Sequence, residues 1–92
     1  MESMRESYLE VTFRHGRALA AYYYLPRESG ARSHRTERAE QGILIDYSEA
    51  GHPIGLELTA PALVTVSALN QVLQGLGQPE IREEDLAPLA AA

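Results

Sequence analysis

The clearest pattern of apolar and polar positions lies between Gly42 and Thr59. Two apolar runs, Ile43–Ile45 and Ile54–Leu58, flank the polar stretch Ser48–Gly51. Apolar runs separated by a short polar segment that ends in glycine are typical of a β-hairpin. We therefore expect two paired strands here.

The expected loop length follows from the faces of the apolar side chains. A three-residue loop would pair Asp46 with Ile54, and the apolar side chains of the two strands would then lie on opposite faces. A four-residue loop keeps them on one face, so we expect that loop, closed by Gly51 with a positive φ. The predicted pairs are Tyr47 with His52, Ile45 with Ile54, and Ile43 with Leu56.

The N-terminal third predicts a second hairpin. Tyr8–Arg14 alternates between apolar and polar residues, which indicates a half-buried strand. After the turn His15–Arg17, the segment Ala18–Leu25 is apolar or aromatic on both faces, as is typical of a strand inside a sheet or in an interface. The apolar side of the first strand holds Leu9, Val11 and Phe13.

The period of the pattern changes after Pro61. Apolar residues then recur at spacings of three and four, which predicts an amphipathic helix with Thr65 as its N-cap and Gly75 or Gly77 at its end. The segment Ile81–Leu89 could add one further helical turn. The apolar stripe consists of Val66, Leu69, Val72, Leu73 and Leu76.

These elements predict an α+β domain. We expect a small antiparallel sheet of four to five strands, built from hairpins and followed by one C-terminal amphipathic helix. Whether Arg32–Glu40 forms a strand is open, because it lacks apolar alternation and fits only an edge or solvent-facing strand. The domain spans residues 1–92, with a core over 8–77, and the flanking residues 1–7 and 78–92 are expected to be tails or a short extra helix.

Composition narrows the function classes. The chain of 92 residues has a net charge of -5 and no cysteine. The negative charge argues against nucleic-acid binding, which depends on neutralising phosphates, and the missing thiols exclude a disulfide or thiolate metal site. No apolar run is long enough to span a membrane and no signal core is evident, so we expect a cytoplasmic protein.

The second hairpin carries a resemblance. The stretch LIDYSEAGHPIGLEL resembles the signature of a small bacterial family, domain of unknown function 2283. The resemblance implies a compact, strand-rich bacterial domain. It implies no activity, because none is established for the family. The matching positions are Asp46, Tyr47, Gly51, Gly55 and Glu57.

Candidate chemistry is sparse. Asp46 and Glu57 are expected on the hairpin face opposite the isoleucines, where a paired-carboxylate site is conceivable. Catalysis would also require a cleft that perturbs their pKa values and a group that positions substrate, and no pattern indicates either. The three histidines show no metal-binding spacing. We therefore assign no catalytic residue, no metal ligand and no cofactor.

Two hypotheses remain. The first is a non-catalytic module that binds a second copy of itself, most simply as a dimer, or a small bacterial protein. One helix can cover one sheet face only, so the doubly apolar strand would otherwise be exposed. The second hypothesis is a small-ligand or metal-binding domain, conceivably enzymatic, that uses Asp46, His52 and Glu57. The expected interface residues are Leu19, Tyr22, Tyr23, Tyr24 and Leu25.

Overall fold

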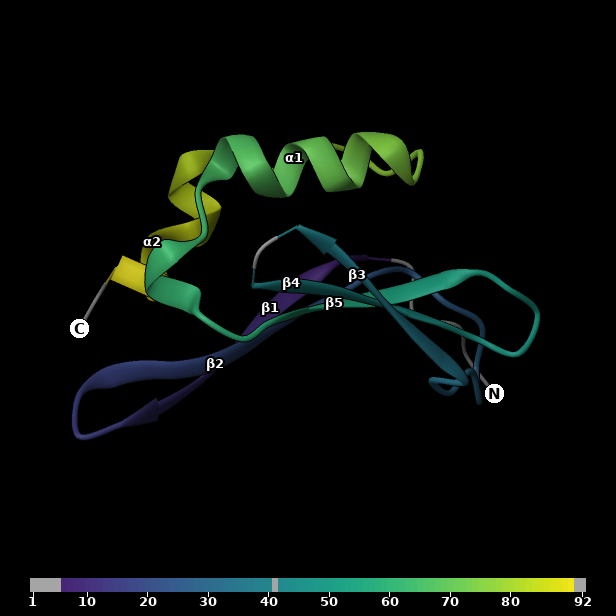
Figure 1. Ribbon diagram of the computed structural model, residues 1–92, viewed down its shortest axis with the longest axis horizontal. Helices are drawn as coiled ribbons and strands as arrows, with labels where there is room; N and C mark the ends of the chain where they lie inside the picture. Colours follow the sequence, from purple (N-terminus) through teal and green to yellow (C-terminus); the bar gives the residue numbers. More distant parts are fainter. Residues whose placement is uncertain (1–5, 41, 91–92) are drawn as a thin grey trace.

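The computed structural model describes residues 6–40 and 42–90. Its five strands form one antiparallel sheet in the order β1-β2-β5-β4-β3 (Figure 1). The predicted α+β class is confirmed, and the sheet reaches the upper end of the expected strand number. The strands are β1 (Tyr8–Arg14), β2 (Arg17–Tyr24), β3 (Arg35–Glu40), β4 (Ile43–Tyr47) and β5 (Pro53–Leu58).

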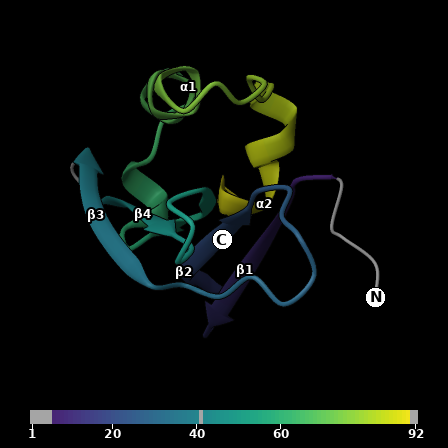
Figure 2. The same cartoon turned by 90° about the vertical axis from the view of Figure 1, so that its right-hand side faces the viewer.

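The helical segments lie on one face of this sheet, and the opposite face carries none of them (Figure 2). The expectation of one C-terminal helix is wrong, because a second helical segment follows the first. Acidic residues in its first turn favour that second segment, since they suit the positive end of a helix. The segments are η1 (Pro61–Leu63), α1 (Val66–Gly75), η2 (Glu83–Leu86) and α2 (Ala87–Ala90).

Both ends of α1 are fixed by the residues expected from the sequence. The Thr65 hydroxyl accepts a hydrogen bond from the Ala68 backbone N–H at 3.0 Å, which caps the first turn. At the other end Gly77 has φ +70, and the N–H of Gln78 donates to the carbonyl of Leu73 at 2.9 Å. This is the Schellman arrangement, and it assigns Gly77 rather than Gly75 as the terminating glycine.

The β1–β2 hairpin turns through His15 and Gly16, which both have positive φ, as a two-residue hairpin turn requires. The predicted strand Tyr8–Arg14 is confirmed. Phe13 alternates onto the same side as Leu9 and Val11, but it is 45% exposed. A bulge beside Phe13 leaves Leu19 of β2 without a cross-strand partner and ends the regular burial pattern before the tip.

The β4–β5 hairpin has the expected faces but a different register. Its apolar residues are buried together, and Gly51 has φ +86 as predicted. The predicted pairs are wrong, by one position beside the loop and by two along the strands: Ile45 pairs with Leu56, not Ile54. The loop between Tyr47 and Pro53 has five residues instead of four, which supplies one position, and the register shift between Asp46 and Tyr47 supplies the other. The resulting two-residue slip keeps the apolar strand residues on their predicted face. The other corrected pairs are Ile43 with Leu58 and Tyr47 with Pro53.

The open question about Arg32–Glu40 is answered by β3, an edge strand over Arg35–Glu40 with every residue exposed. Its predecessor β2 lies on the far side of β5 and β4, so the connection 25–34 crosses the end of the sheet (Figure 2). The charged residues of β3 discourage pairing with another chain along that edge.

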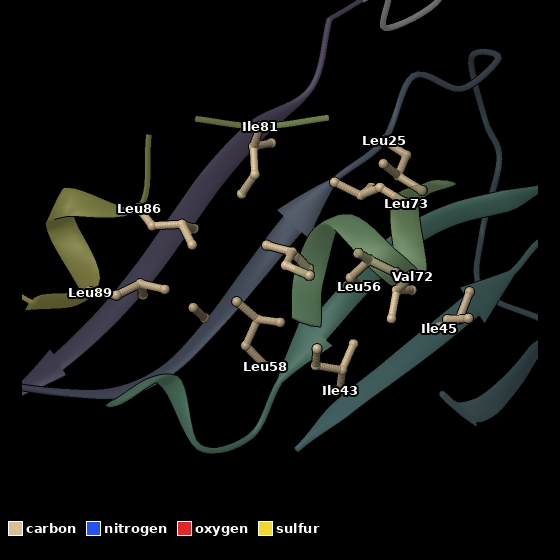
Figure 3. Packing of buried hydrophobic residues seen from close by; sticks show 12 residues of the cluster. Leu25, Ile43, Ile45, Leu56, Leu58, Val72, Leu73, Ile81, Leu86 and Leu89 are labelled. Carbon is tan, nitrogen blue, oxygen red and sulfur yellow. The ribbon is translucent and has the colours of Figure 1, made fainter. Parts of the chain in front are cut away.

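The core lies between the sheet and the helices, and it extends past residue 77 (Figure 3). Ile81, Leu86 and Leu89 are buried with the strand residues, so residues 81–89 belong to the core. The Asn70 side chain of α1 holds this segment in place. Its amide accepts from the Ile81 N–H at 2.8 Å and donates to the Ile81 carbonyl at 3.0 Å. In the described part of the chain, every helix is too short or too polar to span a bilayer.

Candidate functional site

The helix-free face of the sheet carries three tyrosines from its first two strands, Tyr8, Tyr22 and Tyr24, here called the tyrosine cluster. The rings of Tyr8 and Tyr24 are stacked, with centroids 4.4 Å apart and planes inclined by 14°. Tyr22 meets Tyr24 edge-on, with centroids 4.6 Å apart. Tyr8 remains 49% exposed, whereas Tyr22 and Tyr24 are partly buried, so the cluster faces solvent mainly through the Tyr8 ring.

Tyr22 reaches from β2 across β5 to β4. Its hydroxyl donates to a carboxylate oxygen of Asp46 at 2.7 Å. The Tyr22 side chain can cross β5 because the β5 residue beneath it is Gly55. A Cβ at this position would overlap the Tyr22 ring. Thr36 of β3 donates to the other Asp46 oxygen at 2.6 Å, so both carboxylate oxygens are satisfied. With only 8% exposure, Asp46 is a buried carboxylate with two donors.

The electrostatics of the cluster favour protonated tyrosines. Burial raises the pKa of Tyr22 well above its ordinary value, and the hydrogen bond to Asp46 raises it further. Burial also raises the pKa of Tyr24, together with the hydrogen bond from its hydroxyl to Glu10 at 3.1 Å. A neutral hydroxyl that donates to a carboxylate would repel it once ionised. These tyrosines therefore act as hydrogen-bond donors.

Arg27 borders the cluster. Its guanidinium lies over the Tyr24 ring, 5.3 Å from the centroid, and donates to the backbone carbonyls of Ile54 and Leu25. A cation over an aromatic face is attracted by the ring electrons. Arg27 thus anchors the start of the crossing connection to the aromatic surface.

The five expected interface residues divide between the two faces. Leu25 is fully buried in the core, and Tyr23 is partly buried and packs against that core. The helices cover the sheet face on which both residues lie. Tyr22 and Tyr24 lie on the helix-free face, and Leu19 is 55% exposed near the hairpin tip.

The residues of the alternative hypothesis are not brought together. Asp46 and Glu57 share the helix-free face, as predicted, but Asp46 is buried and Glu57 is exposed. His52 lies in the β4–β5 loop. Within residues 6–40 and 42–90, no three His, Asp or Glu side chains are grouped as a metal site requires. The combination of Asp46, His52 and Glu57 is therefore not a metal centre in this structure.

A cavity of about 950 Å³ lies at the end of the sheet, between the crossing connection, the β4–β5 loop and the end of α1. Apolar residues such as Ile54 and Leu76 form part of its wall. Its polar wall includes Arg32, His34 and His52. No sequence pattern indicated this cavity, because its walls come from three segments with no shared motif.

The tyrosine cluster was only partly predictable. Tyr8, Tyr22 and Tyr24 were all placed in predicted strands, but the stacking of Tyr8 on Tyr24 and the roles of Gly55 and Thr36 were not predicted. The alternation in β1 predicts that Tyr8 lies on the face away from Leu9, and this was the one signal in the sequence for the position of Tyr8. Comparison with protein-family models, with curated proteins and with solved structures finds no match to this chain.

Proposed function

We propose that this protein is a non-catalytic interaction module that self-associates, most simply as a two-fold dimer, through the half of its sheet formed by β1 and β2. One observation carries the proposal. The helices cover one sheet face (Figure 2), whereas the tyrosine cluster lies on the other face, where Tyr8 is 49% exposed. Soluble monomers rarely expose a contiguous aromatic surface of this kind.

The chemistry of the cluster suits an interface. Tyrosine is enriched in interface centres, because its ring packs against apolar surface while its hydroxyl keeps a polar partner. Tyr22 and Tyr24 already have such partners in Asp46 and Glu10. Their rings are therefore held in place before binding, and little side-chain entropy remains to be lost.

The motif positions support a structural role over a chemical one. Asp46 anchors Tyr22, Gly55 leaves room for the ring between them, and Gly51 closes the loop with positive φ. These are three of the five positions that carry the resemblance to domain of unknown function 2283. In this proposal, that signature describes a sheet built to hold an aromatic residue across its central strand.

Sedimentation equilibrium at low micromolar concentration tests the proposal. We expect a dimer mass for the wild-type chain and weaker association for Tyr8→Ser, which removes the most exposed ring of the cluster. Leu63→Ser is the matched control, because Leu63 is a 75% exposed apolar residue of η1, outside the cluster. A wild-type monomer mass would overturn the proposal, as would equal weakening by both substitutions.

The cavity favours a second candidate function, the binding of a small anion. Arg32 has no carboxylate within 4.0 Å in the described part of the chain, and two imidazoles share the cavity wall with it. Titration with inorganic phosphate, followed through the imidazole NMR signals of His34 and His52, tests this function. His15 lies in a distant turn and is the internal control. Signals that move no more than those of His15 would exclude phosphate binding there.

A further inference from the structure

We infer that the self-association surface is the outer edge of β1, which pairs antiparallel with β1 of a second copy so that the two sheets join into one. The inference rests on the proposed self-association and names its geometry. The sheet has two edges, β1 and β3. They differ in the features that decide whether an edge accepts another strand.

The β3 edge is protected. Charged side chains occupy four of its six positions, and a register shift interrupts its pairing between Arg38 and Glu40. Charges and bulges are the usual means by which proteins keep an edge strand from pairing. Arg35 is further engaged, with an ion pair to Glu37 and its guanidinium 4.3 Å from the centroid of the Tyr47 ring.

The β1 edge is not protected in this way. Its seven residues, Tyr8–Arg14, carry two charges, and the extra residue of the bulge beside it belongs to β2. No strand lies on its outer side among residues 6–40 and 42–90. Aromatic side chains at both ends of this edge, Tyr8 and Phe13, are about half exposed. An edge of this kind accepts a further strand through its backbone groups.

The sequence of β1 is complementary to itself when two copies pair antiparallel. With Val11 on the two-fold axis, Leu9 lies opposite Phe13 of the second copy, so an exposed apolar ring gains an apolar neighbour. Tyr8 then lies opposite Arg14 of the second copy, where a cation can meet the ring. Glu10 lies diagonal to the same arginine, and like charges are never directly opposed. All seven residues of each strand find partners in this register.

This geometry places one tyrosine cluster at each end of the two joined β1 strands. Tyr8 lies three residues from the axis and Tyr24 pairs with Tyr8, so the two clusters lie at opposite ends of the joined β1 strands, each beside Arg14 of the other copy. A closed two-fold contact uses the same surface on both copies and therefore ends at a dimer. The partner that fits the edge is thus a second copy of this chain.

The absence of cysteine from the chain permits a direct test with single-cysteine variants. In Val11→Cys the two introduced thiols meet at the axis, with Cα atoms within the range that a disulfide spans. This variant should therefore form a covalent dimer in a glutathione redox buffer. Ala39→Cys, in the β3 edge, is the control for random collision. Thr12→Cys tests the register, because an axis at Val11 separates its two introduced thiols along the strand.

The possible outcomes distinguish failure of the inference about the β1 edge from failure of the proposed self-association. We expect the covalent yield of Val11→Cys to exceed that of both other variants several-fold. If Thr12→Cys gives the highest yield, the Val11 axis is wrong. If the wild type is a dimer but Val11→Cys only equals Ala39→Cys, the edge inference fails and self-association stands. A monomeric wild type overturns both.

A second pair of variants covers the case in which cysteine at position 11 impairs folding. Phe13→Lys changes an exposed residue and places a charge in the edge, as natural edge strands do, so we expect at least about tenfold weaker dimerisation. Leu63→Lys makes the same change at an exposed apolar residue of η1 and should leave the dissociation constant unchanged. Equal dissociation constants for Phe13→Lys and the wild type would overturn the inference.

Discussion

The Tyr22 hydroxyl lies 2.7 Å from a carboxylate oxygen of Asp46, although β5 lies between the strands β2 and β4 that carry these two residues. The contact ties β2 to β4 through side chains. It depends on the absence of a side chain at Gly55, which lies beneath the ring. Four strands join this one network, since Thr36 of β3 donates to the same carboxylate.

Gly55→Ala tests the requirement for that gap. The new methyl group would overlap the Tyr22 ring, and overpacking of this kind costs about 1–3 kcal/mol. We expect that loss in the free energy of unfolding, measured by urea denaturation. Gly75→Ala, at the end of α1 and with no atom within 4 Å of the new Cβ, should be neutral or stabilising by up to about 1 kcal/mol. Equal effects at the two glycines would contradict the crossing geometry.

Tyr22→Phe tests the hydrogen bond itself. It removes one of the two side-chain donors to a buried carboxylate, and hydrogen bonds to charged groups contribute about 1.5–3 kcal/mol. Tyr24→Phe removes a hydroxyl whose acceptor, Glu10, is exposed, so its cost should stay within about 0.5 kcal/mol. Chemical denaturation of both variants measures the difference. A larger loss for Tyr24→Phe would contradict the assignment of Asp46 as the anchored group.

Alkaline pH should weaken the fold through Tyr22. Its pKa in the folded protein lies above the unfolded value of about 10, so the folded state retains a proton that the unfolded state has released. The free energy of unfolding therefore decreases as the pH rises above about 10, and the stabilisation is fully present below that value. Denaturation midpoints between pH 9 and 11 measure the decline. Tyr22→Phe should show a shallower decline than the wild type, and identical slopes would rule out Tyr22 as its source.

Leu86→Ala tests whether the C-terminal segment belongs to the core. Leu86 is buried, and truncation of a buried leucine costs about 2–5 kcal/mol. Glu83→Ala in the same segment changes an exposed side chain and should stay within about 0.5 kcal/mol of the wild type. Thermal or urea denaturation distinguishes the two. A neutral Leu86→Ala would show that residues beyond 77 are dispensable for folding.

Sequence patterns correctly predicted the features that depend on interactions between residues close in sequence. The alternation in Tyr8–Arg14, the cap at Thr65 and the positive φ of Gly51 depend on residues close in sequence, and each was predicted correctly. The predicted register of β4 against β5 was wrong because the loop is one residue longer than expected and a bulge adds a second residue, and these two shifts together leave the apolar face unchanged. Face preference alone cannot distinguish such registers.

The candidate site was harder to predict because it combines strands that are distant in sequence. Tyr22 could be identified as aromatic, but its contact with Asp46 requires β5 to lie between β2 and β4. No pattern within one segment indicates that strand order. The same applies to Thr36, whose edge strand lacks the apolar alternation by which strands are recognised.

The pairing of β2 with β5 has a kinetic consequence. The two hairpins β1–β2 and β4–β5, with β3 beside β4, connect neighbours in sequence, whereas β2 meets β5 along only four residue pairs, from Ala21–Leu58 to Tyr24–Gly55. Closing the long intervening segment is entropically expensive until those pairs form, so this junction is the expected bottleneck of folding. Substitutions at the junction should therefore slow refolding, while substitutions in η2 and α2 should mainly accelerate unfolding.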